Sequence, residues 1–81
     1  MRLDKFLKVS RIIKRRTVAN DACDAARVSV NGRPAKASYD VKVGDILEIT
    51  FGVRTLRIRV LDIKDTVGKD AAASLYEVIE S

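Results

Sequence analysis

The stretch VSVNG at residues 28–32 marks the place where the hydrophobic pattern of this 81-residue chain changes period. Its two valines alternate with a serine, which is typical of a strand with one buried face. Asn31-Gly32 follows at once, and this dipeptide favours the type I′ turn of a two-residue hairpin. Pro34 cannot donate a hydrogen bond to a sheet, so the returning strand at residues 33–36 is expected to be short or to lie at an edge.

Residues 2–10, on the N-terminal side of this stretch, are predicted to form a first helix. An apolar stripe recurs at helical spacing and would pack inward. The stripe consists of Leu3, Phe6 and Leu7. The opposite side of the helix is basic and would face outward, with the side chains of Arg2, Lys5 and Lys8.

Residues 17–26 are predicted to form a second helix, with Thr17 as an early capping residue. One face carries small side chains that would let two helices approach closely, namely Ala19, Ala22, Cys23 and Ala26. On this face Cys23 is interpreted as a small buried hydrophobe. A reactive thiol is the alternative, but the chain has no His to serve as its base.

Short strands are predicted on the C-terminal side. Alternating patterns indicate strands at residues 46–51, 54–63 and 75–79, while residues 65–74 suggest a loop with one helical turn. Phe51, like Phe6, is expected in the core. The fold class is therefore α+β, with two N-terminal helices packed on a small, mostly antiparallel sheet. A chain of this length is expected to form one domain over residues 1–81.

The composition excludes several classes of protein. With 47% hydrophobic and 33% charged residues, the chain is globular rather than disordered. Its single Cys cannot form an intramolecular disulfide, and its longest apolar runs are only two or three residues. We expect a cytoplasmic protein with no membrane partner.

Common catalytic and metal sites are also excluded. The absence of His rules out Ser-His-Asp and Cys-His catalysis and, with one Cys, the common zinc sites. No phosphate-binding Gly-rich loop is present, and none of the Asp and Glu residues sits in a recognisable acid/base pair. We therefore expect neither enzyme activity nor a metal or cofactor.

The net charge of +5 is unevenly distributed along the chain. Residues 1–38 contain ten Lys and Arg against three Asp and Glu, whereas residues 39–81 contain six against eight. A basic half joined to a slightly acidic half favours one face that binds a polyanion. A generic solubilising charge is the alternative.

The basic side chains of residues 2–16 are the predicted RNA-binding residues, because guanidinium and ammonium groups on rigid helices suit successive phosphates. They are Arg2, Lys5, Lys8, Arg11, Lys14, Arg15 and Arg16. A solvated helix end, a nuclear-localisation signal and a membrane-surface patch are the alternatives. Aromatic residues are few, which favours recognition of the RNA backbone and shape over base stacking. Tyr39 is expected to anchor its loop or to touch RNA.

Several of these segments together resemble the RNA-binding domain of small-subunit ribosomal protein S-four. The resemblance covers roughly residues 2–50 and rests on RLDKFL at 2–7, Arg16 with Ala19, VSVNG at 28–32 and VGDI at 43–46. It implies the alpha-L motif, with RNA contacts on the two helices and the hairpin, and a core that includes Leu3, Leu7 and Val30. The family usually has Gly where this chain has Ala26, which puts the exit of the second helix in doubt.

The opening residues 1–11, KRRT at 14–17 and LYEV at 75–78 are similar to small stand-alone members of this family in bacterial ribosome-associated quality control. That similarity implies binding to large ribosomal subunits obstructed by peptidyl-tRNA. The partners would be large-subunit ribosomal RNA, the peptidyl-tRNA and the tailing factor RqcH, and the role would be support of C-terminal alanine tailing by a monomer.

Three alternatives to that role remain. One is a heat-shock-type recycling factor for large subunits without a role in tailing. A second is an RNA-modifying enzyme reduced to its binding domain, and a third is a non-ribosomal protein-interaction module that uses the sheet. Asp4 would orient one of the arginines or act simply as an acid at a helix N-terminus.

Overall fold

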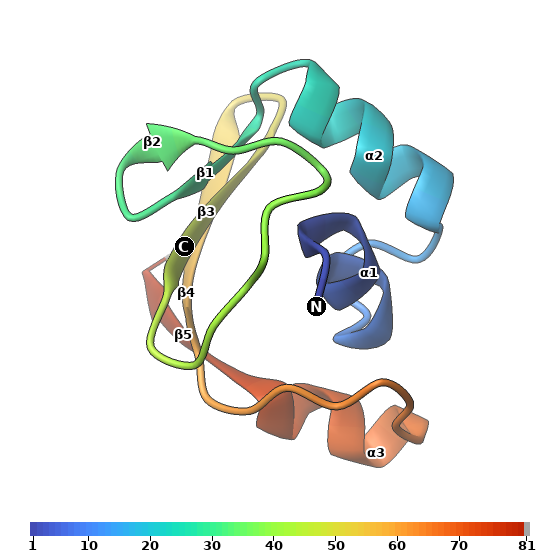
Figure 1. Cartoon of the computed structure of the whole chain (residues 1–81). Coiled ribbons are helices and arrows are strands. Elements are labelled where there is room, and N and C mark those ends of the chain that lie inside the picture. The colour runs from blue at the N-terminus through green and yellow to red at the C-terminus, as the bar shows by residue number, and fades with distance from the viewer. Residues whose placement is uncertain (81) are drawn as a thin grey trace.

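A computed structural model of the protein describes residues 1–80, including the side chains of residues 1–79. Two helices cover one face of a twisted five-stranded sheet, and a short third helix lies beyond the end of the first (Figure 1). The elements follow in the order α1 (Leu3–Val9), α2 (Arg16–Asp24), β1 (Val28–Val30), β2 (Arg33–Pro34), β3 (Ile46–Phe51), β4 (Arg54–Val60), α3 (Lys69–Ala72), the 3-10 turn η1 (Ala73–Leu75) and β5 (Tyr76–Glu80).

The sheet has the strand order β2-β1-β3-β4-β5, and each neighbouring pair is antiparallel. This arrangement confirms the predicted α+β class and the antiparallel sheet. The predicted fourth strand was too long, since β4 ends at Val60, and the predicted helical turn before the last strand is present as α3 and η1. Within residues 1–80, no helix is long and apolar enough to cross a membrane.

The hairpin between β1 and β2 has the predicted geometry. Asn31 and Gly32 both have positive φ angles, of 52° and 86°, as a type I′ turn requires. β2 lies at the edge of the sheet and contains only Arg33 and Pro34. Pro34 pairs with Ser29, and the next residue, Ala35, donates its N–H to the carbonyl oxygen of Val28, so the proline stands where a backbone N–H would face the open edge of the sheet.

The core lies between α1, α2 and the inner face of the sheet. Leu3, Phe6 and Leu7 of α1 are completely buried, as are Leu47 and Ile49 of β3, and Val30 is nearly so. The predicted core positions Leu3, Leu7 and Val30 are thus confirmed. Burial of large apolar side chains is the main term that holds such a small domain together.

The prediction for Phe51 was wrong, because 45% of this residue is exposed. Strand alternation places Phe51 on the same face as Leu47 and Ile49, but it is the last residue of β3. An open groove remains between Phe51 and Val18 of α2, so the helical layer does not cover it.

Both ends of α2 differ from the prediction. The helix begins at Arg16, its N-cap is Arg15, and Thr17 lies inside the first turn, with no side-chain cap. At the other end Ala26 lies outside the helix and is exposed, so it does not extend the stripe of small residues. Ala26 instead has a φ of 59°, and the N–H groups of Ala26 and Arg27 donate to the carbonyl oxygens of Cys23 and Ala22. This is a Schellman cap with alanine where glycine is usual.

Candidate nucleic-acid interface

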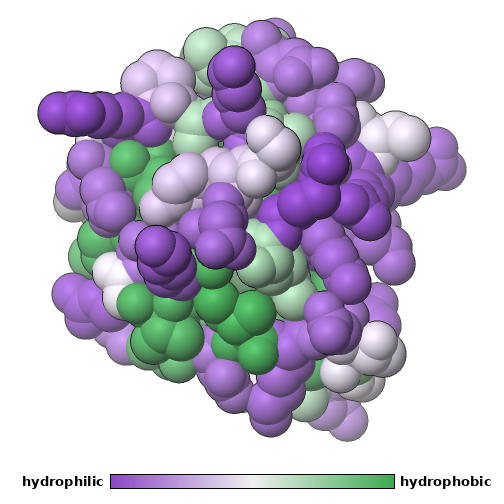
Figure 2. All heavy atoms as spheres, viewed as in Figure 1, coloured by the Kyte–Doolittle hydropathy of each residue, from purple (hydrophilic) through white to green (hydrophobic). Residues whose placement is uncertain are grey.

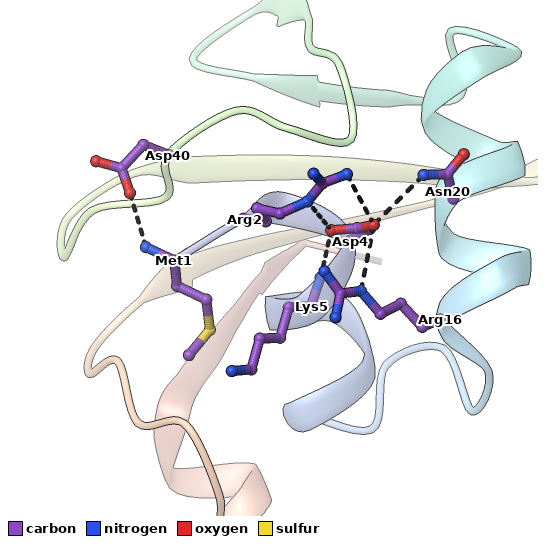
Figure 3. A network of polar contacts seen from close by, with 7 residues as sticks. All are labelled: Met1, Arg2, Asp4, Lys5, Arg16, Asn20 and Asp40. Carbon is purple, nitrogen blue, oxygen red and sulfur yellow. Dashed lines mark hydrogen bonds and ion pairs between the residues drawn. The ribbon is translucent and has the colours of Figure 1, made fainter.

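A buried carboxylate organises the N-terminal surface where α1 meets α2 (Figure 3). The side chain of Asp4 is only 3% exposed and accepts hydrogen bonds from both helices. Arg2 donates from Nε at 3.1 Å and from Nη2 at 3.4 Å, and Arg16 donates from Nε at 3.4 Å. Asn20 Nδ2 donates at 3.4 Å, and the backbone N–H of Lys5 donates at 2.8 Å. Asp4 therefore holds two guanidinium groups beside each other.

The two arginines keep donors free for a ligand. Their side chains are 51% and 46% exposed, and the hydrogen bonds to Asp4 leave Nη1 of Arg2 and both Nη atoms of Arg16 available. A planar guanidinium fixed in this way is suited to bidentate contact with phosphate oxygens. Figure 2 shows strongly hydrophilic side chains over α1 and α2, while apolar side chains gather at the lower left over the connection between β2 and β3.

The charge state of Asp4 follows from its surroundings. Its burial acts to raise the pKa of the carboxyl, but hydrogen bonds from Arg2, Asn20 and Arg16 together outweigh this effect and lower the pKa below its usual value. Asp4 is therefore a carboxylate at neutral pH. Of the two interpretations of Asp4 from the sequence, the structure confirms the ion pair and extends it to both arginines.

Contacts of Met1 and Leu3 hold the start of α1 against the loop between β2 and β3. The terminal ammonium of Met1 donates to Asp40 Oδ1 at 2.7 Å (Figure 3). The backbone N–H of Leu3 donates to the carbonyl oxygen of Tyr39 at 2.8 Å. The hydrogen bond from the ammonium lowers the pKa of Asp40. These contacts tie the residue before α1 to the loop between β2 and β3 and so place Arg2.

A second polar cluster fixes that loop against the hairpin. Tyr39 donates from its hydroxyl to Asp45 Oδ2 at 2.9 Å, and the backbone N–H of Lys42 donates to the same oxygen at 3.0 Å. Asn31 donates from Nδ2 to Asp45 Oδ1 at 3.2 Å and accepts from the N–H of Ile46 at 3.0 Å. The hydrogen bond to Asp45 raises the pKa of Tyr39. The predicted role of Tyr39 as a loop anchor is confirmed.

The other predicted RNA-binding residues do not join the Arg2–Arg16 pair. Lys8, Arg11 and Lys14 line a separate groove of about 610 Å³. Lys5 Nζ donates to Asp65 Oδ1 at 3.2 Å. Arg15 is exposed, and its side chain has no partner within residues 1–80. The structure thus divides the predicted basic face into two surfaces.

Sequence reasoning missed Asn20, Asp65 and Lys69. Asn20 follows Arg16 by four residues, which places both on one face of α2, and that spacing was the available signal. Asp65 and Lys69 lie far along the chain from α1, and no local pattern links them to it.

Cys23 is a buried residue of the core, and burial raises the pKa of its thiol to about 11. A thiol with such a pKa is protonated at neutral pH and is a poor nucleophile. The interpretation as a small hydrophobe is confirmed. Across residues 1–80, no group of three or more His, Cys, Asp and Glu side chains is placed to hold a metal ion.

The fold and this basic surface define a small RNA-binding module, and comparison with known proteins agrees. The family model for the S4 domain matches residues 1–47, and the chain belongs to the S4 domain family. The predicted resemblance to ribosomal protein S-four is thereby confirmed.

Relatives match nearly the whole chain. A protein named RQC P-site tRNA stabilizing factor from Streptococcus pneumoniae is 57% identical over 79 residues, covering 98% of this chain and 90% of that one. The protein of the same name from Bacillus subtilis is 52% identical over 80 residues, covering 99% and 93%. The trimeric structure of heat shock protein 15 from Vibrio cholerae has a TM-score of 0.90 at 32% identity, covering 96% of this chain and 80% of that one.

Proposed function

We propose that the protein binds ribosomal RNA and peptidyl-tRNA on obstructed large ribosomal subunits and stabilises the tRNA in the P site. The observation that carries this proposal is the pair of guanidinium groups held by Asp4, at 3.1 and 3.4 Å from its oxygens. The names of the relatives that are 57% and 52% identical over nearly the full length support the choice of P-site tRNA. The cytoplasm is the compartment in which this function would operate.

The chemistry of the proposed contact is electrostatic. Asp4 neutralises part of the charge of Arg2 and Arg16 but holds both side chains still, so less conformational entropy is lost when a phosphate binds. Arg15, which precedes Arg16 in the chain, adds an exposed cation without a partner in residues 1–80. Such a surface recognises the backbone and shape of a folded RNA rather than its bases.

The finer part of the proposal concerns the tailing reaction. A nascent chain can be extended without a template only while its tRNA stays in the P site, because there the amino group of each incoming aminoacyl-tRNA attacks the ester bond of the peptidyl-tRNA and takes over the chain. We therefore infer that the protein supports C-terminal alanine tailing by RqcH, as a monomeric single-domain factor that performs no chemical step itself.

The structural likeness to heat shock protein 15 supports a second candidate, a recycling factor for large subunits. The two candidates differ in what happens when the gene is deleted. Loss of alanine tails from stalled chains would support the first candidate, whereas normal tails with accumulated peptidyl-tRNA on large subunits would support the second.

Co-sedimentation in sucrose gradients tests the proposal. The wild-type protein should co-migrate with large subunits that carry peptidyl-tRNA, and Arg16→Ala should shift it to the top of the gradient. Arg54→Ala is the matched control, because Arg54 is an exposed arginine on β4 outside both helices. Wild-type protein that stays at the top would reject ribosome binding.

A further inference from the structure

A second basic site lies at the opposite end of α1 from Arg2. The groove of about 610 Å³ is bounded by the end of α1, the α1–α2 connection and the segment that precedes α3. Its lining residues are Lys8, Val9, Arg11, Lys14, Asp65, Thr66, Val67 and Lys69. Four of these eight side chains are cations and one is an acid, so the groove is strongly positive.

The four cations have no ionic partner in the protein. Within residues 1–80, no hydrogen bond or ion pair engages the side chains of Lys8, Arg11, Lys14 or Lys69. The acid of the groove, Asp65, is already paired with Lys5 at 3.2 Å. Unpaired like charges repel one another across a groove, and an anionic ligand would relieve that repulsion.

The backbone of Arg11 ends α1. Its φ of 63° is left-handed, it directly follows the C-cap Ser10, and its N–H donates to the carbonyl oxygen of Lys8, as is common where a helix ends. The chain after this cap forms one wall of the groove, with Arg11 and Lys14.

This groove and the Arg2–Arg16 surface are built differently. The second wall of the groove comes from residues 65–69, which lie outside residues 1–47 matched by the S4 domain model. The two sites share α1 but have no lining residue in common.

We propose that the groove binds a second run of RNA phosphates, so that the protein contacts two separate backbone segments at once. Cations spaced along a groove suit a strand with regularly spaced charges, and Thr66 adds a hydroxyl donor. The half-buried side chains of Val9 and Val67 offer apolar contact to the sugars. Continuity with the Arg2–Arg16 surface along α1 favours RNA over an acidic protein segment. This inference deepens the proposed function and rests on it.

Titration of ¹⁵N-labelled protein with a short single-stranded oligouridylate tests the groove directly. Backbone amide signals of residues 8–14 and 65–69 should shift in the wild type. The double variant Lys14→Gln/Lys69→Gln should lose those shifts and keep the ones at Arg2 and Arg16. Its plot of log affinity against log salt should become less steep by about 1.4, because each phosphate contact on a single strand contributes about 0.7.

Lys64→Gln is the control for each of the two changes, since it removes one positive charge from a lysine near the groove that pairs with Asp62 instead. This variant should keep the wild-type shifts and salt slope. Absence of shifts at residues 65–69, or an unchanged slope in the double variant, would overturn the proposal. Groove shifts with polyglutamate but not with oligouridylate would overturn it in favour of an acidic protein partner.

Failure of the broader function would look different. The wild-type protein could fail to co-migrate with large subunits in the gradient and still show the groove shifts with oligouridylate. That result would contradict the ribosomal role and still support the second RNA site.

Discussion

Asp4 is the residue on which the proposed interface depends, because it joins α1 to α2 through Arg2, Arg16 and Asn20. Asp4→Asn removes the charge but keeps the shape of the side chain. We expect a loss of about 1–2 kcal/mol in the free energy of unfolding, since hydrogen bonds to a charged group are involved but both arginines are half exposed. Urea denaturation measures this change. An Asp4→Asn protein as stable as the wild type would show that the carboxylate does not hold the helices together.

The ionisation of Asp4 also makes the stability of the protein depend on pH, in a direction that follows from its pKa. The pKa of Asp4 is lowered in the folded protein relative to its ordinary value of 3.8. Its ion pairs therefore stabilise the fold above that pH, and the stabilisation is lost as the pH falls through the lower folded pKa. Melting temperatures of the wild type and Asp4→Asn should converge on acidification below pH 3.8. A difference that stays constant down to pH 2 would contradict this assignment.

The left-handed backbone conformation of Ala26 lowers the stability of the folded protein. Its φ of 59° suits glycine, so Ala26→Gly should raise the free energy of unfolding by about 1 kcal/mol. The neighbouring Ala25 has a φ of −84°, and Ala25→Gly should instead lower stability. Thermal melts of the two variants give the comparison. If Ala26→Gly is no more stable than Ala25→Gly, the cap is not strained as described.

The elements themselves were largely predictable from local signals. The Asn31-Gly32 turn and the alternating strands follow from short-range chemistry, which the structure confirms. The predictions were wrong in detail at the ends of the helices and strands. Thr17 looked like a cap because its side-chain type is right, but the extended backbone at Arg15 starts α2 one residue earlier. The exposure of Phe51 depends on where the helical layer stops, which only tertiary packing decides.

The hydroxyl of Tyr39 is one of the contacts that hold the loop between β2 and β3, and this gives a prediction at the level of the element. Tyr39→Phe removes the 2.9 Å hydrogen bond to Asp45 and should cost about 1 kcal/mol. Amide hydrogen exchange should show faster opening of residues 36–42 in this variant. Tyr76→Phe is the control, since the Tyr76 hydroxyl has no hydrogen bond within residues 1–80. Equal amide exchange rates in the two variants would contradict the role of Tyr39 as a loop anchor.

At the scale of the whole molecule, the uneven charge of the chain predicted a polyanion-binding face but not its layout. Residues 2–16 supply cations to two sites because α1 has a charged residue near each end. The second site also needs Lys69, which lies more than fifty residues along the chain from Arg11. Local patterns carry no information about such a contact, whereas the i, i+4 spacing of Arg16 and Asn20 indicates that both lie on one face of α2.

The central claim is that the arginine pair organised by Asp4 binds ribosomal RNA. The most direct test is the affinity of purified large subunits carrying peptidyl-tRNA for Arg2→Ala, Arg16→Ala and the double variant, measured over a range of salt. Each single change should weaken binding and reduce the slope of log affinity against log salt by about 0.9, without unfolding the protein. A double variant that binds with wild-type affinity and slope would contradict the claim.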